Sequence, residues 1–170
     1  MSLRPLLAVL LLLAGHAVAQ ERPTLVVPPG GQLRQVEAGG PPTFTGTTTI
    51  HAILIAQWVP DAQGDGLPGP TFHLLPVPQS AAQIPHLAGA PMRFLSITDG
   101  ERILARATHE DIAAEFAARK LGVVHVEGLF TITDLRVGTP CATAGQARIL
   151  EADPIRVRFP FQAAPLACPS

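Results

Sequence analysis

The sequence predicts a mainly β protein with one α-helix, arranged as a five-stranded Greek-key barrel. Three observations lead to this fold class: a long β-forming run at 43–60, shorter alternating segments on both sides of residue 110, and one stretch with helical spacing at 110–121. The alternative architecture is a two-layer β-sandwich with a helical insert.

The run from Thr43 to Pro60 is expected to form one long strand, because it contains no charged residue and is rich in Thr and Ile. Strand side chains alternate, so one face is apolar throughout and the other is polar at both ends. Gly46 is a candidate bulge at which the strand bends. The apolar face consists of Ile50, Ala52, Leu54, Ala56 and Trp58.

The other elements follow from alternation, turn signals and helical periodicity. Asp99-Gly100 indicates a two-residue hairpin turn, Thr108 a helix N-cap, Gly122 a helix C-cap and Gly128 a bulge. Phe116 is expected to fill the core from the helix. The expected strands are Thr24–Val27, Gln32–Val36, Thr71–Val77, Arg93–Thr98, Glu101–Ala107, Val123–Val137, Gln146–Glu151 and Ile155–Phe161, with one helical turn at Ser80–Gln83 and the helix at Glu110–Leu121.

Residues 1–19 have the features of a secretory signal peptide. Arg4 gives a basic start, Leu6–Gly15 is an apolar run of ten residues, and Ala17–Ala19 is an A-x-A cleavage signal. The run is too short to span a bilayer, although a retained helical anchor is the alternative. We expect an exported protein, periplasmic or secreted, with no transmembrane anchor after cleavage. Amino-terminal sequencing should begin at Gln20, and a start at Met1 would contradict this expectation.

The mature chain would have 151 residues, enough for one domain with a sizeable core. We expect a Pro/Gly-rich arm at 20–42 and a single domain at 43–170. Arg4 is the only charged residue in the segment that cleavage removes. The mature chain therefore keeps 11 basic and 13 acidic residues, and its net charge is about −2. This charge is not typical of proteins that bind nucleic acid or anionic membranes. We expect neither a nucleic-acid partner nor a cofactor.

Cys141 and Cys168 are the two cysteines of the chain. Two thiols in an exported protein favour one disulfide, which would tie the C-terminal tail to the domain. A redox or nucleophilic pair is the alternative, but the two are not arranged as C-x-x-C and no basic cluster flanks them. The bridge should contribute about 3.5 kcal/mol. Thiol titration of the unfolded, non-reduced protein should find no free thiol, and two free thiols would exclude the bridge.

The order of these elements resembles that of an OB-fold, over about two-thirds of the mature chain. The phrase VVHVEGLFTITD at 123–134 is similar to the V-x-V-x-G strand of small exported OB-like domains of unknown function. OB-folds that bind nucleic acid use strand aromatics and a basic groove. In this chain the corresponding strand face has at most two aromatic residues, Phe72 and Phe94, and little positive charge. The resemblance therefore implies a scaffold rather than an activity.

His51, His73 and His125 fall on three expected strands, and three imidazoles that meet can bind Zn or Cu. A metal-binding protein is therefore one alternative function. The chain has no H-E-x-x-H motif, and histidines on half-exposed strand faces are usually solvated or hydrogen-bonded.

A small periplasmic enzyme is the second alternative. The mature chain has three serines, and none lies in a G-x-S-x-G motif. Turn formation and helix capping already explain the acidic cluster around Asp99 and Glu101, so the residues predict a protein that is not an enzyme. The three serines are Ser80, Ser96 and Ser170.

The remaining hypothesis is a non-catalytic module that binds a protein, a peptide or an envelope component. The loops Asp61–Gly69 and Gln79–Pro91 are its expected binding loops. Trp58 is either part of the core or the base of a shallow pocket beside the first loop. The spacing of the acids in that loop does not match a calcium-binding EF-hand. The candidate binding surface consists of Trp58, Asp61, Asp65 and Phe72.

Overall fold

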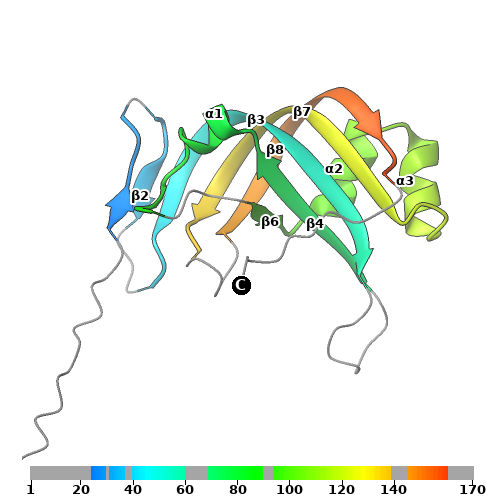
Figure 1. Cartoon of the computed structure of the whole chain (residues 1–170), viewed down its shortest axis with the longest axis horizontal. Helices are drawn as coiled ribbons and strands as arrows, with labels where there is room; N and C mark the ends of the chain where they lie inside the picture. The colour runs from blue at the N-terminus through cyan, green and yellow to red at the C-terminus, as the bar shows by residue number, and fades with distance from the viewer. Residues whose placement is uncertain are drawn as a thin grey trace, which may run out of the picture.

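The computed structural model describes residues 24–29, 31–36, 40–59, 69–89, 94–138 and 145–160. These residues form a mainly β protein with a six-stranded sheet, a separate two-stranded sheet and three short helices (Figure 1). No helix in these ranges combines the length and the apolar character needed to cross a bilayer. The strands are β1 (Leu25–Val26), β2 (Arg34–Val36), β3 (Thr43–Val59), β4 (Gly69–Pro76), β5 (His86–Leu87), β6 (Leu95–Ile97), β7 (Val123–Arg136) and β8 (Gly145–Arg158), and the helices are α1 (Pro78–Ala81), α2 (Gly100–Ala107) and α3 (Glu110–Ala117).

Strand β3 is the long strand that the sequence predicts, and it pairs with β2, β4 and β7. Its register with β7 shifts between Phe44 and Thr47, and Gly46 there has a φ of 97°. The expected bulge at Gly46 is therefore confirmed. The bend lets the first residues of β3 pair with β2 and the last ones with β4, as the arched ribbon in Figure 1 shows.

The large sheet has the order β2-β3-β4-β6-β8-β7, with an additional pairing between β3 and β7. The pair β6–β8 is parallel and the others are antiparallel. The bulge expected at Gly128 is confirmed by a register shift between Glu127 and Gly128. A Cβ on Gly128 would lie 2.4 Å from the carbonyl oxygen of Asp153, so only glycine fits this close approach.

Buried side chains of the large sheet and of the helices form one hydrophobic core. The apolar face predicted for β3 is buried there, apart from the half-buried Trp58, and Phe116 enters from α3 as expected. Helix α2 adds Ile103 and Leu104, each with an exposed fraction of 1%. Helices α2 and α3 lie at one end of the arched sheet, and β2 lies at the other (Figure 1).

The strand predicted at Glu101–Ala107 is wrong, because these residues form helix α2. Ile103, Leu104 and Ala107 are the buried side chains, and this spacing follows one face of a helix rather than the alternation of a strand. Asp99-Gly100 therefore begins a helix instead of making a hairpin turn. Leu, Ala, Arg and Glu are all good helix formers, which agrees with this outcome.

The single helix predicted at Glu110–Leu121 is also corrected. The described residues contain three helices, and α3 ends at Ala117. Thr108 is the C-cap of α2, while His109 is the N-cap of α3. Arg119 takes the left-handed conformation, with a φ of 59°, that the sequence assigns to Gly122. The N–H of Lys120 donates to the carbonyl of Glu115 and closes the helix, which ends four residues earlier than expected.

Three further boundaries differ from the sequence prediction. The last two expected strands form one continuous strand, β8, and the strand expected at 93–98 is only three residues long. The short helix α1 begins at Pro78, two residues before the expected turn. The short strands expected in the N-terminal arm are present as β1 and β2, and β1 pairs with β5.

Candidate binding site

An open depression of about 640 Å³ lies where β6 leaves the side of β4. Strand β4 pairs with β3 along its whole length, but β6 pairs with it only at His73 and Leu74. Ile97 lies opposite Phe72 in this register, and after it the chain turns into α2, so the residues of β4 before Phe72 have no strand on that side. The lining residues come from β4 (Pro70, Thr71, Phe72 and His73), from β6 and the turn after it (Ser96, Ile97 and Thr98), and from the start of α2 (Asp99, Gly100, Glu101 and Arg102).

The floor of the depression depends on a close contact between Phe72 and Gly100. A Cβ built on Gly100 would lie 1.9 Å from Cγ of Phe72. The absence of a side chain at Gly100 therefore lets the first turn of α2 rest directly on the Phe72 ring. Phe72 also packs edge-on against Phe116, with ring centroids 6.0 Å apart, which anchors this ring to the core.

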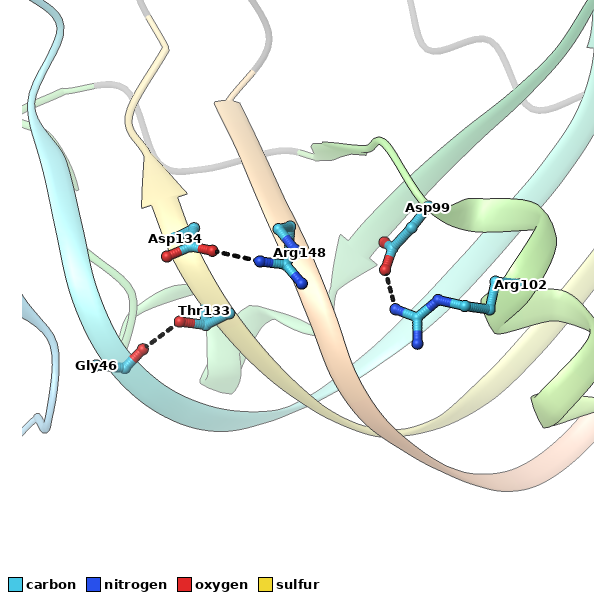
Figure 2. Close-up of polar contacts among 6 residues, drawn as sticks. All are labelled: Gly46, Asp99, Arg102, Thr133, Asp134 and Arg148. Atoms are coloured by element: carbon cyan, nitrogen blue, oxygen red, sulfur yellow. Dashed lines mark hydrogen bonds and ion pairs between the residues drawn. The ribbon is translucent and has the colours of Figure 1, made fainter.

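The rim of the depression carries two carboxylates and one guanidinium, so one negative charge has no positive partner among the lining residues. A guanidinium nitrogen of Arg102 contacts Oδ2 of Asp99 within the first turn of α2 (Figure 2). Oδ1 of Asp99 is buried and has no hydrogen-bond partner, and Glu101 adds a second carboxylate to the lining. The depression thus offers free hydrogen-bond acceptors and one net negative charge.

His73 borders the depression opposite Ser96, its cross-strand neighbour on β6. Its ring stands edge-on to Phe94, with centroids 5.2 Å apart, and its Nδ1 is buried without a hydrogen-bond partner. Burial lowers the pKa of His73 from its usual 6.5, so this ring is neutral at neutral pH. It therefore adds a further polar group without a positive charge.

The three candidate metal ligands share one face of the sheet but lie on different strands. His73 on β4 and His125 on β7 both pair with Ile55, so β3 lies between them. Two strand spacings therefore separate the backbones of His73 and His125 by about 10 Å. Among the residues that the structure describes, no group of three or more His, Cys, Asp or Glu side chains is arranged to hold a metal ion.

The carboxylate of Glu127 lies on the same face as the three histidines. Nε2 of His51 lies 3.4 Å from Oε1 of Glu127, and Arg158 lies 3.7 Å from the other carboxylate oxygen. Burial, and secondly the charge of Arg158, lower the pKa of His125. Glu127 therefore lies between His51 and Arg158 on the sheet face, close to His125, whose pKa is lowered.

The fold is expected to lose stability as the pH falls below 6.5. The pKa of His73 and that of His125 are both lowered in the folded state, so the unfolded chain takes up protons first. The loss should begin near 6.5 and continue down to the folded-state pKa values. Urea unfolding between pH 7.5 and 5 would measure it.

The double variant His73→Gln/His125→Gln should have a flatter stability profile over this pH range. His109→Gln serves as the control, since His109 is exposed at the start of α3. An unchanged slope in the double variant would show that other groups carry the pH dependence.

Trp58 is half-buried and packs against the core, so it is not the base of the depression. Its ring centroid lies 5.7 Å from that of Phe116, and its Nε1–H donates to the carbonyl of Phe116 at 2.8 Å. The guanidinium of Arg119 lies 4.5 Å from the ring centroid on the outside. Trp58 thereby joins the end of β3 to the end of α3.

Of the candidate binding surface, Phe72 lines the depression and Trp58 does not. Asp61, Asp65, Cys141 and Cys168 lie outside the described residues, so the loop and disulfide predictions stay predictions. Ser80, one of the three serines of the mature chain, has a structural role. Its hydroxyl accepts a hydrogen bond from the backbone N–H of His51 at 3.0 Å.

Most of the lining residues could not be predicted from the sequence. Thr71, Ser96 and Thr98 enter the site because β4 and β6 separate, which is a tertiary feature. The available signal was the Asp99-Gly100 pair followed by Glu101, since an acidic first turn also favours a helix start.

A comparison with protein-family models finds no match for this chain, and comparisons with curated proteins and with solved structures find none either.

Proposed function

We propose that this protein is a non-catalytic binding module that takes a protein, a peptide or an envelope component into the depression between β4, β6 and α2. The observation that carries the proposal is the depression itself, about 640 Å³ in volume. This size lies within the range of ligand sites, and the lining mixes apolar surface with a few polar groups, as such sites do. Asp99 and His73 each bring a buried polar atom without a partner.

The scaffold we propose for this module is a closed five-stranded barrel of OB-like form. The support is the set of pairings β3–β4, β4–β6, β6–β8, β8–β7 and β7–β3, in which each strand has two neighbours. The parallel pair is β6–β8, and helices α2 and α3 fall between β6 and β7 in the chain. An OB-like barrel has its helix before the fourth main strand, and β7 is the fourth strand of this set.

Export to the periplasm or the medium forms part of the proposal and rests on residues 1–19. The proposed bridge between Cys141 and Cys168 is consistent with that compartment, because disulfides persist in oxidising environments. A domain fixed by one bridge and presenting a preformed depression suits recognition outside the cytoplasm.

Site-specific photo-crosslinking tests the binding function. A benzoylphenylalanine at Thr98, an exposed lining residue, should form a specific adduct in the cells that make the protein. The same group at Glu115, exposed on α3, is the control and should not form it. Adding Ser96→Trp, which fills the depression, should remove the adduct. If Thr98 and Glu115 give the same products, the depression is not the binding site.

A further inference from the structure

Strand β8 has a free edge beyond its short pairing with β6. Strand β6 pairs with Gly145–Ala147, and the chain then turns into α2. From Ala152 onward, β7 is the only strand of the described residues that pairs with β8. Exposed large apolar side chains gather along this part of the chain, which shows that the edge is open to solvent. They are Leu150, Ile155 and Phe159, with exposed fractions of 40%, 62% and 47%.

The backbone of β8 turns two residues toward this edge. The N–H of Trp58 donates to the carbonyl of Gly122, and the bonds of an antiparallel pair repeat at every second residue. Even-numbered residues of β7 up to Phe130 therefore bond to β3, and the odd-numbered residues between them bond to β8. The β8 partners of these odd-numbered residues are Glu151, Asp153, Arg156 and Arg158.

Ala152 and Val157 lie between these partners, so their N–H and C=O groups point away from β7. No backbone hydrogen bond to another described residue uses these groups on that side. Unpaired backbone groups along a strand edge are a template for pairing with another chain. Natural edges are usually protected by charges that repel a second strand, so the charges beside Ala152 and Val157 decide what this edge can accept.

The charged side chains of this edge are complementary to themselves. All of them pair with odd-numbered residues of β7, so they share the sheet face opposite the buried core residues. Two acids come first along the strand and two arginines follow. Three of the four have no ion pair with a described residue, and the fourth, Arg158, lies 3.7 Å from Glu127. The four exposed side chains are Glu151, Asp153, Arg156 and Arg158.

We propose that two copies of this chain form a two-fold dimer by antiparallel pairing of their β8 edges. The register that opposes Glu151 to Arg158 of the second copy also opposes Asp153 to Arg156, and the two-fold axis repeats both ion pairs. A shift by two residues in either direction retains only one of the two kinds of pair. Opposite charges on neighbouring strands stabilise a pairing and like charges oppose it. The dimer is independent of the binding function proposed above.

The same register matches the backbone of the two copies. Ala152 lies opposite Val157 of the second copy, and both residues turn their N–H and C=O groups to the edge. Such a pair exchanges two hydrogen bonds, and the two-fold axis gives a second pair. Pro154 has no N–H and would interrupt other registers, but here it falls beside the axis, next to the exposed Ile155.

Sedimentation velocity of the mature chain over a concentration series tests the dimer. The wild-type protein should show a reversible monomer–dimer equilibrium. Asp153→Arg and Arg156→Glu should each weaken the dimer at least tenfold, because each places like charges opposite one another. An equimolar mixture of the two variants should dimerise again, since each new charge then faces an opposite one. Glu115→Arg, at an exposed position of α3, is the control and should leave the equilibrium unchanged.

Amide hydrogen exchange gives the second readout. The amides of Ala152 and Val157 should exchange at least tenfold more slowly in the dimer than in the monomer. Those of Asp153 and Arg156, already bonded to β7, should not change. A protein that is monomeric at every concentration would overturn the proposal. A dimer that tolerates Asp153→Arg and leaves the Ala152 amide unprotected would show that the copies meet at another surface, which also overturns it.

Discussion

Replacing Trp58 with alanine is expected to lower the free energy of unfolding by about 3 kcal/mol. The ring packs on Phe116 at 5.7 Å and lies under the Arg119 guanidinium, so truncation removes an aromatic contact on one side and a cation–π contact on the other. It also removes one of the two donors to the carbonyl of Phe116 at the end of α3, where the backbone N–H of Arg119 remains. Because Trp58 is half-buried, the value falls at the low end of the range for core tryptophans. Urea denaturation of the mature protein measures it.

Trp58→Phe is the matched control, because phenylalanine retains a packing ring and loses only the hydrogen bond. Its expected cost is about 1 kcal/mol. Arg119→Ala should cost no more than about 1 kcal/mol through the cation–π contact. A Trp58→Ala cost below about 1 kcal/mol would place the ring at the surface. It would also reopen Trp58 as part of the binding surface.

The β part of the fold could be predicted from the sequence wherever one face of a strand is continuously apolar. Ile50, Ala52 and Leu54 alternate with polar or half-exposed residues, and only a strand buries all three. Glycines at bulges were also predictable, because Gly46 and Gly128 interrupt runs of β-formers that continue on both sides. Local pattern and tertiary structure agree at these positions.

Helix α2 could not be predicted in the same way, because its sequence is compatible with two structures. Ile103 and Ala107 lie on one face of either a strand or a helix, and Asp-Gly is common both in hairpins and before helices. The contact between Gly100 and Phe72 favours the helix start here, and it joins residues 28 positions apart in the chain. No local signal contains that information.

The same limit applies to the candidate site. Alternation correctly places His51, His73 and His125 on one sheet face, but the distance between them depends on how many strands separate them. Phe72 was predicted as part of the candidate binding surface. The depression that it lines exists because β6 is only three residues long, and the sequence predicts a strand of six. The length of β6 is set by the residue at which α2 begins, and this length could not be predicted from the sequence.

Replacing Gly46 with alanine is expected to lower the free energy of unfolding by about 3 kcal/mol, from left-handed strain and overpacking together. The φ of 97° is unfavourable for any L-residue with a Cβ. That Cβ would also lie 2.3 Å from the carbonyl oxygen of Gln32, a backbone atom that cannot rotate away. Relief would require moving the segment before β2 or straightening the bulge that sets the β3–β7 register.

Thr133 makes the second of these routes unfavourable, because its hydroxyl donates to the carbonyl of Gly46 at 2.8 Å (Figure 2). Gly122→Ala is the matched control: nothing lies within 4 Å of a Cβ there and its φ is not positive. That variant should change stability by less than about 1 kcal/mol, in the stabilising direction if at all. Equal costs at Gly46 and Gly122 in urea denaturation would mean that the bulge is not rigid. In that case the path of β3 would have to be fixed by its pairing with β7 rather than by this glycine.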